Sequence, residues 1–335
     1  MDCTNLTSVA LEDVPCPMGC ARDDEALFIA HDRFHNLPGD YAIVRCRGCD
    51  LVRTNPRPQP SSMGFYYPDN YGPYQSTAVT DAHTIVGSPS VLRRILRIFS
   101  RRLIAFNVEN IPTKVPGQLF EIGCASGSYL ARMKALGWKV AGLEFSASAA
   151  DRARAAGLSV QTGAIEVASA PEVKPDLIVG WMVLEHMHDP VSALAKMNDW
   201  AKPNAWLALS TPNIASFDFK LFGPNSYALQ LPNHLYHFSP RTITRLLERG
   251  GWSVTRIFHQ RVLSNYIGSI GFWLEAIGAP TWLSRWVVNL SAHPGYYHLT
   301  LYPLAWLLSL FGQTGRMTVW AQRRAPELAD AKFVS

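Results

Sequence analysis

The sequence is poor in charge: 17% of its 335 residues are Asp, Glu, Lys or Arg. The formal net charge is only +5, and the basic residues are dispersed except on one predicted helix, residues 90–106. Because no motif that reads DNA or RNA is present, we expect no nucleic-acid partner. A mild positive charge suits an anionic small molecule, such as a nucleotide or a phosphate, or a lipid surface.

Long apolar runs are also missing. Residues 1–11 contain an acidic side chain, Asp2, and lack an apolar core of the length that a signal peptide needs. The longest uncharged apolar run, residues 296–312, includes His298 and Pro303 and falls short of a transmembrane span. We therefore expect a cytoplasmic protein, with peripheral association at the inner face of the membrane as the alternative.

Cysteine is scarce, but four of the six cysteines form two close pairs. Three residues separate Cys16 from Cys20, and two residues separate Cys46 from Cys49. Two such turns can direct four thiolates to one ion, and in a reducing compartment the pattern indicates structural zinc rather than disulfides. Four protein ligands leave no open position, so this metal would stabilise a small zinc-ribbon-like module and would not activate water.

An apolar run, an acid and a loop of small residues follow one another in residues 119–127, which read LFEIGCASG. A helical pattern begins directly afterwards, so the stretch predicts a strand, a tight turn and a helix, the opening unit of a nucleotide-binding α/β domain. Small residues are needed where a backbone approaches a ligand closely. The acid Glu144 ends the next apolar run and can accept hydrogen bonds from both hydroxyls of a ribose.

At these residues the chain resembles the class I S-adenosylmethionine-dependent methyltransferases. The resemblance implies that the first acid and the glycines line the methionine half of the cofactor, that Glu144 holds the ribose and that residues 162–166 contact the adenine. The family usually has Gly where this chain has Ala125. The cofactor-binding residues predicted in this way are Glu121, Gly123, Cys124, Gly127, Glu144, Phe145, Ala164, Ile165 and Trp181.

A second string that resembles the family, V-L-E-H-M-H-D-P over residues 183–190, follows a predicted strand at residues 176–181. It places Glu185 and His186 at the carboxyl edge of the sheet, where open α/β sheets bind their ligands. Some relatives bind magnesium through an extra acid three residues before this Glu. Here that residue is Met182, which disfavours a catalytic metal.

The N-terminal half resembles one branch of these enzymes. The cysteine pairs are followed by N-P-R-P at residues 55–58 and by a tyrosine-rich stretch at residues 65–71. Together they are similar to the branch that includes sugar C-methyltransferases and enzymes of surface-glycan clusters. The tyrosines would either line an acceptor pocket or pack beneath a long loop, and both interpretations stay open.

Residues 231–240, L-P-N-H-L-Y-H-F-S-P, also resemble this branch. Two histidines and a tyrosine lie within four residues, on a loop expected beside the cofactor. A histidine that is neutral near pH 7 suits a general base. We therefore predict His186, His234 and Tyr236 as catalytic residues on the acceptor side, and we interpret His237 as a cap of the next helix.

The remaining patterns predict a Rossmann-like, doubly wound α/β fold with a mainly parallel seven-stranded sheet, whose last strand returns only at residues 316–322. Residues 262–314 precede it, are rich in Trp, Leu, Ile and Tyr, and contain one acid, Glu275. Interfacial helices that contact a membrane or a lipid-linked substrate explain this insertion slightly better than a homodimer interface, and a cap over the acceptor site would explain it too. The predicted organisation is a zinc-knuckle module at 1–60, a tyrosine-rich loop and linker helix at 61–116, the cofactor-binding core at 117–261, a hydrophobic helical insertion at 262–314, and the last strand and tail at 315–335.

These patterns together predict a methyltransferase that uses S-adenosylmethionine and carries structural zinc. The expected acceptor is a small molecule or glycan, such as a sugar, a nucleotide sugar or a lipid-linked glycan, methylated on oxygen or carbon. Quinone or phenol O-methylation is one alternative. A non-catalytic recruitment module with a vestigial cofactor pocket is another, which Ala125 alone favours. A dehydrogenase is disfavoured because the loop lacks the G-x-G-x-x-G spacing.

Overall fold

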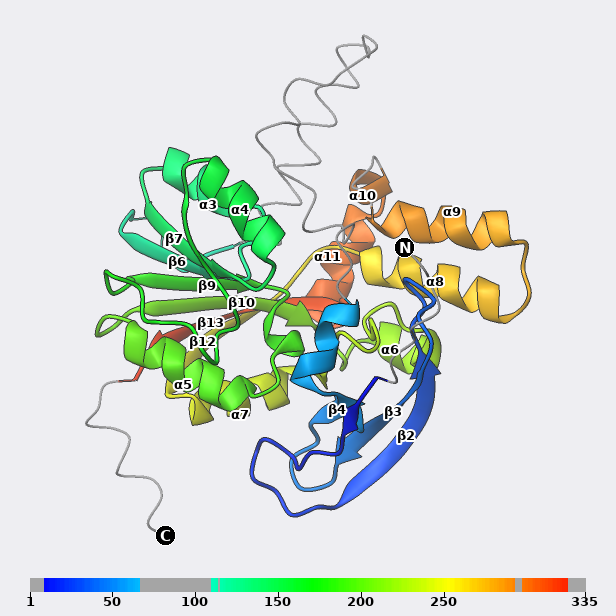
Figure 1. Cartoon of the computed structure of the whole chain (residues 1–335). Helices are drawn as coiled ribbons and strands as arrows, with labels where there is room; N and C mark the ends of the chain where they lie inside the picture. Colours follow the sequence, from blue (N-terminus) through cyan, green and yellow to red (C-terminus); the bar gives the residue numbers. More distant parts are fainter. Residues whose placement is uncertain (1–8, 67–109, 114, 293–296, 325–335) are drawn as a thin grey trace, which may run out of the picture.

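The computed structural model in Figure 1 describes residues 9–66, 110–113, 115–292 and 297–324. The predicted basic helix at residues 90–106 and the tyrosines after Tyr66 lie outside these residues. The described part contains a seven-stranded sheet, a four-stranded sheet and a pair of short strands, with a group of helices between the last two strands of the chain.

The seven-stranded sheet has the strand order β12-β13-β10-β9-β6-β7-β8. Its strands are β6 (Gln118–Ile122), β7 (Lys139–Glu144), β8 (Ser159–Thr162), β9 (Leu177–Trp181), β10 (Trp206–Pro212), β12 (Trp252–His259) and β13 (Arg316–Arg323). Neighbours from β8 to β10 pair in parallel, whereas β13 pairs antiparallel with β10 and β12. The predicted Rossmann-like sheet, with its reversed last strand, is confirmed.

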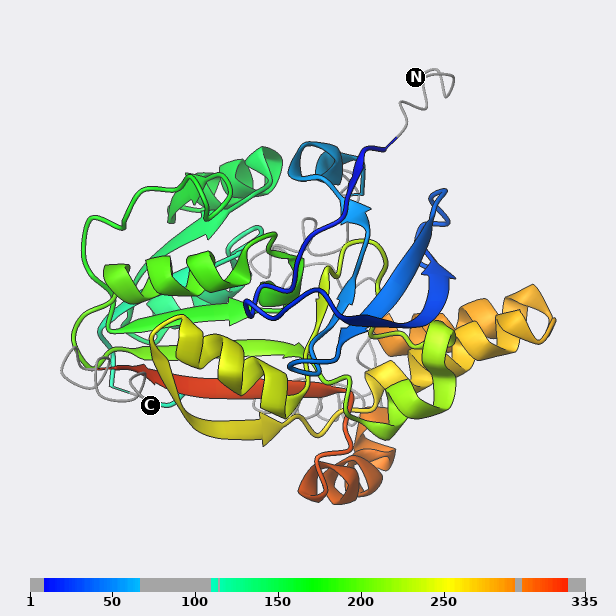
Figure 2. The ribbon, with the colours of Figure 1, turned by 90° about the horizontal axis from the view of Figure 1, so that it is seen from below.

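Helices cover both faces of this sheet (Figures 1 and 2). One face carries α3 (Ser128–Ala135) and α4 (Ala147–Ala155), and the other carries α5 (Pro190–Trp200) and α7 (Pro240–Arg249). Helix α7 begins with a capping box, in which the Ser239 hydroxyl accepts from the Thr242 backbone N–H and the Thr242 hydroxyl accepts from the Ser239 backbone N–H. The interpretation of His237 as the cap is therefore wrong, because Ser239 satisfies the backbone groups that a cap would bind.

The smaller sheet combines two distant parts of the chain. Three strands come from the N-terminal part: β2 (Asp24–His31), β3 (Asp40–Cys46) and β4 (Val52–Thr54). The fourth, β11 (Tyr236–His237), comes from the segment between β10 and α7 and pairs antiparallel with β4. Beside them, β1 (Leu11–Glu12) pairs with β5 (Arg57–Pro58), and the 3₁₀ helix η1 (Pro60–Tyr66) follows.

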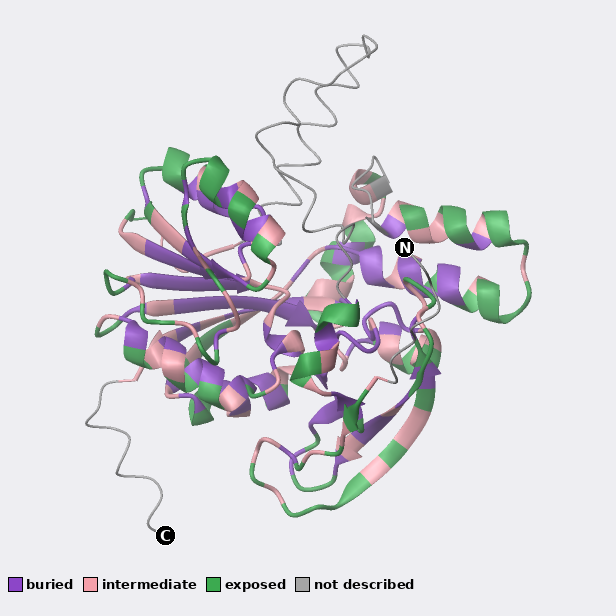
Figure 3. Cartoon of the chain, viewed as in Figure 1, coloured by how far each residue is buried: buried purple, intermediate pink, exposed green. Residues whose placement is uncertain are grey.

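One hydrophobic cluster joins the cysteine pairs to the large sheet. Cys16, Cys46 and Leu51 pack in the same buried cluster as Phe120 and Ile178. Figure 3 shows that the strands of the large sheet are mostly buried, while the outer sides of the helices are exposed. The N-terminal sheet therefore rests directly on the carboxyl side of the core.

The insertion before β13 is helical, as predicted. It contains α8 (Ser264–Ala276), α9 (Thr281–Ala292), α10 (Tyr297–Thr300) and α11 (Tyr302–Leu310). Helices α8 and α9 form a hairpin that extends away from the large sheet in Figures 1 and 2. They pack closely at Gly271, where an added Cβ would lie 2.5 Å from Val288 Cγ2. No helix within the described ranges is long and apolar enough to cross a bilayer.

Candidate active site

The loop after β6 has the conformation that a close backbone approach requires. Gly123, Ala125 and Gly127 have φ angles of 69°, 47° and 82°. An added Cβ at Gly123 would lie 2.3 Å from Val183 Cγ1, and one at Gly127 would lie 2.4 Å from Leu158 Cδ1, so both positions require glycine. Ala125 adopts the left-handed conformation that Gly adopts more readily. The substitution of Gly by Ala thus leaves the turn intact.

Glu144 binds this loop from the end of β7. Its Oε2 accepts a hydrogen bond from the Ala125 backbone N–H at 2.7 Å, and its Oε1 accepts one from Ser146 N–H at 2.8 Å. Burial raises the pKa of Glu144, and these N–H groups oppose the shift. Each carboxylate oxygen keeps a second acceptor site, so ribose hydroxyls can bind in addition. Glu144 therefore orders the loop, and its ribose contact stays a prediction.

The other predicted cofactor residues surround this loop. Glu121 is buried in β6. Burial raises the pKa of the Cys124 thiol, and the negative charges of Glu121 and Glu144 raise it further. The Cys124 side chain packs into the core beside Gly142, so only its backbone faces the loop. Trp181 packs edge-on against Tyr129, with 5.2 Å between ring centroids. Of the remaining three, Ile165 is buried, Ala164 is half-buried and Phe145 is exposed.

The parallel strands β6, β7, β9 and β10 all end at this edge of the sheet. The edge therefore combines a glycine-shaped loop with two buried acids, Glu121 and Glu144, and two aromatic side chains, Phe145 and Trp181. This set fits S-adenosylmethionine, because an adenosine needs a ribose acceptor and aromatic or apolar surfaces, and its amino-acid half needs close access to backbone.

Beside the loop lies a cluster of three side chains, which we call the Glu–His cluster: Glu185, His186 and His234. Glu185 and His186 belong to the 3₁₀ helix η2 (Leu184–His186), and His234 precedes β11. Their candidate ligand atoms all lie within 4.8 Å of one another. The two imidazole rings meet edge-on, with centroids 4.7 Å apart. The structure thus brings two of the three predicted catalytic residues together and adds a carboxyl group.

Backbone carbonyls fix the His234 ring. Its Nδ1 lies 2.8 Å from the Ala228 carbonyl oxygen, and since a carbonyl only accepts, this nitrogen carries the proton. Nε2 is then the nitrogen with the lone pair, and it has no hydrogen-bond partner among the described residues. His186 likewise donates from Nδ1 to the Asn233 carbonyl oxygen at 2.9 Å. A buried imidazole with an acceptor nitrogen is suited to remove a proton.

Burial sets the charge of the cluster. It raises the pKa of Glu185 to about 8, lowers that of His186 to about 4, and lowers that of His234 well below its usual value. The positive charge of Arg316, at the start of β13, lowers the pKa of both Glu185 and His234. Sequence patterns gave no signal for Arg316, because it reaches the site only through the antiparallel return of β13 beside Pro212.

Tyr236 lies in a different network. Its hydroxyl accepts from Arg57 Nη1 at 2.9 Å and donates to the His188 carbonyl oxygen at 3.1 Å. These bonds connect the N-terminal sheet to the loop after η2. The acceptor role predicted for Tyr236 is therefore less supported than those of His186 and His234.

The N-terminal sheet holds His234 in place. The Leu235 backbone N–H donates to the Glu185 carbonyl oxygen at 2.8 Å, and the Thr54 N–H donates to the Leu235 carbonyl oxygen at 3.0 Å. The Thr54 hydroxyl also donates to the His234 carbonyl oxygen at 2.9 Å, and it lies 3.3 Å from His237 Nε2. The segment before β11 is thus bonded on one side to η2 and on the other to β4.

The four predicted metal ligands also come together. The Sγ atoms of Cys16, Cys20, Cys46 and Cys49 lie within 4.8 Å of one another, and those of Cys16 and Cys49 are 3.5 Å apart. Tetrahedral zinc with Zn–S bonds of about 2.3 Å places its sulfurs about 3.8 Å apart, so the arrangement fits this ion. Cys46 ends β3 and Cys49 lies shortly before β4, so this site fixes the turn that leads into β4.

The chain is similar to several known proteins. An S-adenosylmethionine-dependent methyltransferase from Mesorhizobium loti is similar over 68% of this chain and 96% of its own, with 15% identity and a TM-score of 0.43. A second S-adenosylmethionine-dependent methyltransferase, from Archaeoglobus fulgidus, is similar over 69% of this chain and 94% of its own, with 17% identity and a TM-score of 0.42. A ubiquinone biosynthesis O-methyltransferase of Albidiferax ferrireducens is 26% identical over 161 residues, which are 46% of this chain; the match covers 58% of that relative's length.

Residues 92–257 match the model of a family described as a methyltransferase domain. The matched range includes the glycine loop, Glu144 and the Glu–His cluster. The match covers just under half of the chain and includes strands β6 to β10 of the Rossmann-like sheet. These residues are therefore similar to a methyltransferase domain.

Proposed function

We propose that the chain transfers a methyl group from S-adenosylmethionine to a sugar-type acceptor: a sugar, a nucleotide sugar or a lipid-linked glycan. The observation that carries the proposal is the buried His234 imidazole, whose Nε2 is an acceptor next to the cofactor loop. Val183, which precedes η2, contacts the loop at Gly123, so the Glu–His cluster adjoins the cofactor side. A proton acceptor in this place suits a hydroxyl or an activated carbon.

S-adenosylmethionine, when bound, supplies a methyl group on a positively charged sulfur. The chain aligns the acceptor and removes its proton. His234 Nε2 takes the proton, and the Ala228 carbonyl keeps the ring in the orientation that this requires. Glu185, when ionised, stabilises the imidazolium that forms. His186 packs against the His234 ring and positions it.

We also propose zinc at the four cysteines, in a structural role. The ion would fix the turn between β3 and β4, and through β4 the segment that carries His234. It would take no part in the transfer, because four thiolates complete its coordination.

A phenol or quinol acceptor is the second candidate. It is favoured by the similarity to a ubiquinone biosynthesis O-methyltransferase. A phenol loses its proton more readily than a sugar hydroxyl, since its pKa is about 10. The same imidazole would serve it.

The direct test is a screen of nucleotide sugars, lipid-linked glycans and phenols with methyl-labelled S-adenosylmethionine. We expect transfer to a sugar-type acceptor and a fall in kcat of about 10²- to 10⁴-fold in His234→Gln, because the general base is lost. Affinity for S-adenosylhomocysteine should stay unchanged in this variant, and the exposed His31→Gln serves as control.

Transfer to phenols alone would establish the second candidate. Absence of transfer by a folded protein that binds S-adenosylhomocysteine would indicate a recruitment module, and turnover that depends on added divalent cation would make the Glu–His cluster a metal site.

Glu144→Ala should weaken the binding of S-adenosylhomocysteine about tenfold or more, because the glycine loop loses its charge-assisted hydrogen bond at Ala125, the turn after β7 loses the one at Ser146, and the ribose loses its acceptor. Isothermal titration measures the change. Asp151→Ala, which removes an exposed acid from α4, is the matched control and should bind normally. Equal affinity of both variants would remove Glu144 from the cofactor site.

Stability should fall as the pH rises from 6.5 to 8. The pKa of Glu185 is raised in the folded state, so the folded protein keeps a proton on Glu185 that the unfolded chain loses above about pH 4.5. Raising the pH therefore favours the unfolded state. The lowered pKa values of the buried histidines have the opposite effect, but only below about 6.5. Urea unfolding at pH 6.5 and 8 should show the loss in the wild type and a flatter dependence in Glu185→Gln. The same slope in both proteins would show that Glu185 does not titrate there.

The purified protein should contain one zinc ion per chain. Removing it with a chelator under reducing conditions, or by Cys49→Ser, should lower the Tm by at least about 5 °C. Cys3→Ser, outside the cysteine pairs, is the control. A metal-free protein with an unchanged Tm but without activity would contradict the structural role and indicate a catalytic metal.

A further inference from the structure

The helices before β13 expose an unusual set of side chains. All ten tryptophans of the chain lie in the described ranges, and those that are largely exposed belong to this insertion. Within the described residues, ten of the twenty large apolar side chains that are exposed lie on or next to these helices. They are Ile270, Trp273, Ile277, Trp282, Trp286, Leu304, Trp306, Leu307, Leu310 and Phe311, and we call them the apolar surface.

The spacing of these side chains is helical. Ile270, Trp273 and Ile277 follow one side of α8, and Trp282 and Trp286 are four residues apart on α9. Figures 1 and 3 show the α8–α9 hairpin extending from the body, with exposed positions repeated along both helices. Exposed apolar side chains gathered on neighbouring helices are typical of an interaction site.

Three hydroxyls of the insertion bond within their own helices. The hydroxyls of Ser284, Ser291 and Ser309 donate to the carbonyl oxygens of Thr281, Val288 and Trp306 on their own helices. Their O–H donors are therefore satisfied within the insertion. A protein interface needs about one directional hydrogen bond per 100–200 Å² of buried area, whereas the interior of a bilayer needs none.

The charges of the insertion suit an anionic lipid surface. Glu275 is the only acid between residues 262 and 314, and its carboxylate lies 3.7 Å from Arg33 Nη1, so an arginine of the body neutralises it. The exposed Arg285 projects from α9. At the base of the insertion, Arg261 donates to the Tyr302 hydroxyl at 3.1 Å. The one acid of the described insertion is therefore paired with an arginine, which reduces its repulsion of an anionic headgroup.

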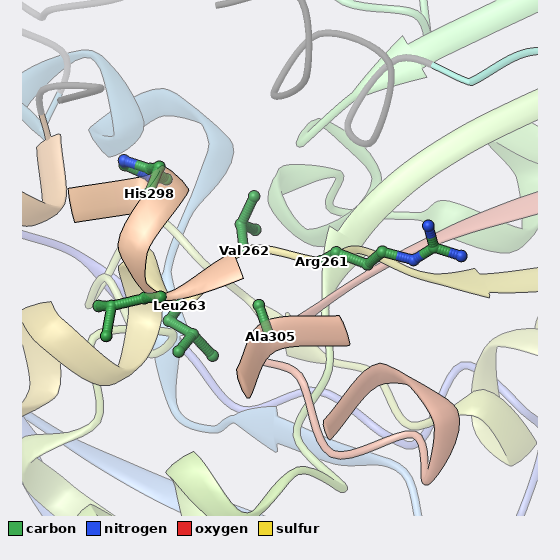
Figure 4. Close-up of a pocket in the computed structure, with 6 residues that line it drawn as sticks. Arg261, Val262, Leu263, His298 and Ala305 are labelled. Atoms are coloured by element: carbon green, nitrogen blue, oxygen red, sulfur yellow. The ribbon is translucent and has the colours of Figure 1, made fainter. Parts of the chain in front are cut away.

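Figure 4 shows a small hollow at this base, where the start of α8 meets α10 and α11. Its lining is Arg261, Val262, Leu263, His298, Leu301 and Ala305. The Arg261 side chain points away from the apolar lining in this view.

We infer that the apolar surface binds the face of an anionic phospholipid bilayer. The tryptophans would lie at headgroup depth, and the leucines and Phe311 would reach the acyl boundary. The helices would lie in the interface and not cross it. This inference does not depend on the proposed acceptor, but it would place the site next to acceptors carried by lipids.

The test uses the full-length, zinc-replete protein with vesicles of phosphatidylcholine containing phosphatidylglycerol. We expect flotation with the vesicles, a shift of tryptophan emission to shorter wavelength, and quenching by lipids with brominated acyl chains. Trp282→Gln with Trp286→Gln should weaken vesicle binding about tenfold or more. The matched control replaces two exposed apolar residues elsewhere, Leu136→Gln with Val167→Gln, and should bind like the wild type.

Two outcomes would overturn the inference. One is vesicle binding that is absent or equal in both double variants. The other is a dimer in lipid-free buffer that the tryptophan variant alone abolishes, since it would assign the surface to a second copy of the chain. Binding of S-adenosylhomocysteine, measured in parallel, shows that each variant is folded and separates this result from a failure of the proposed function.

Discussion

The pairing of β4 with β11 is the contact on which the acceptor side depends. Only Tyr236 and His237 form β11, and their partners Arg53 and Val52 lie more than 180 residues earlier in the sequence. A two-residue strand is not stable alone. It is held because Thr54 bonds to His234 and Leu235 on one side while Leu235 bonds to Glu185 on the other. His234 therefore keeps its place between two sheets that the sequence encodes far apart.

The proposed zinc site would stabilise more than its own module. The four thiols surround the turn between β3 and β4, and β4 orients the segment that carries the proposed base. Arg53 strengthens the same region: it is almost fully buried and bonds to Asp24 on β2 through both Nη atoms. The Tyr236 hydroxyl, which bonds to Arg57 and to the His188 carbonyl oxygen, adds a further contact in this region. These bonds connect β11 to β5 and to the loop after η2, and the catalytic role of Tyr236 stays a prediction.

Local patterns predicted most of the core, because apolar runs and turn residues act within a few residues of one another. The strands of the large sheet, the glycine loop, the four cysteines and the insertion all have such signals. The contacts made between distant segments had none. Examples are the bond from Ala125 to Glu144, the approach of Arg316 to the Glu–His cluster, and the entry of residues 236 and 237 into the N-terminal sheet. His237 was misinterpreted for the same reason, since its environment is made by Thr54.

The most direct measurement of this account is hydrogen exchange of residues 231–238 with and without the metal. If the cysteine site holds β4, and β4 holds His234, removing the metal should increase exchange in residues 46–54 and 231–238 together. Exchange in β9, at the centre of the seven-stranded sheet, should stay slow. Unchanged protection of residues 231–238 while residues 46–54 open would contradict the account, because the proposed base would then be positioned without the N-terminal sheet.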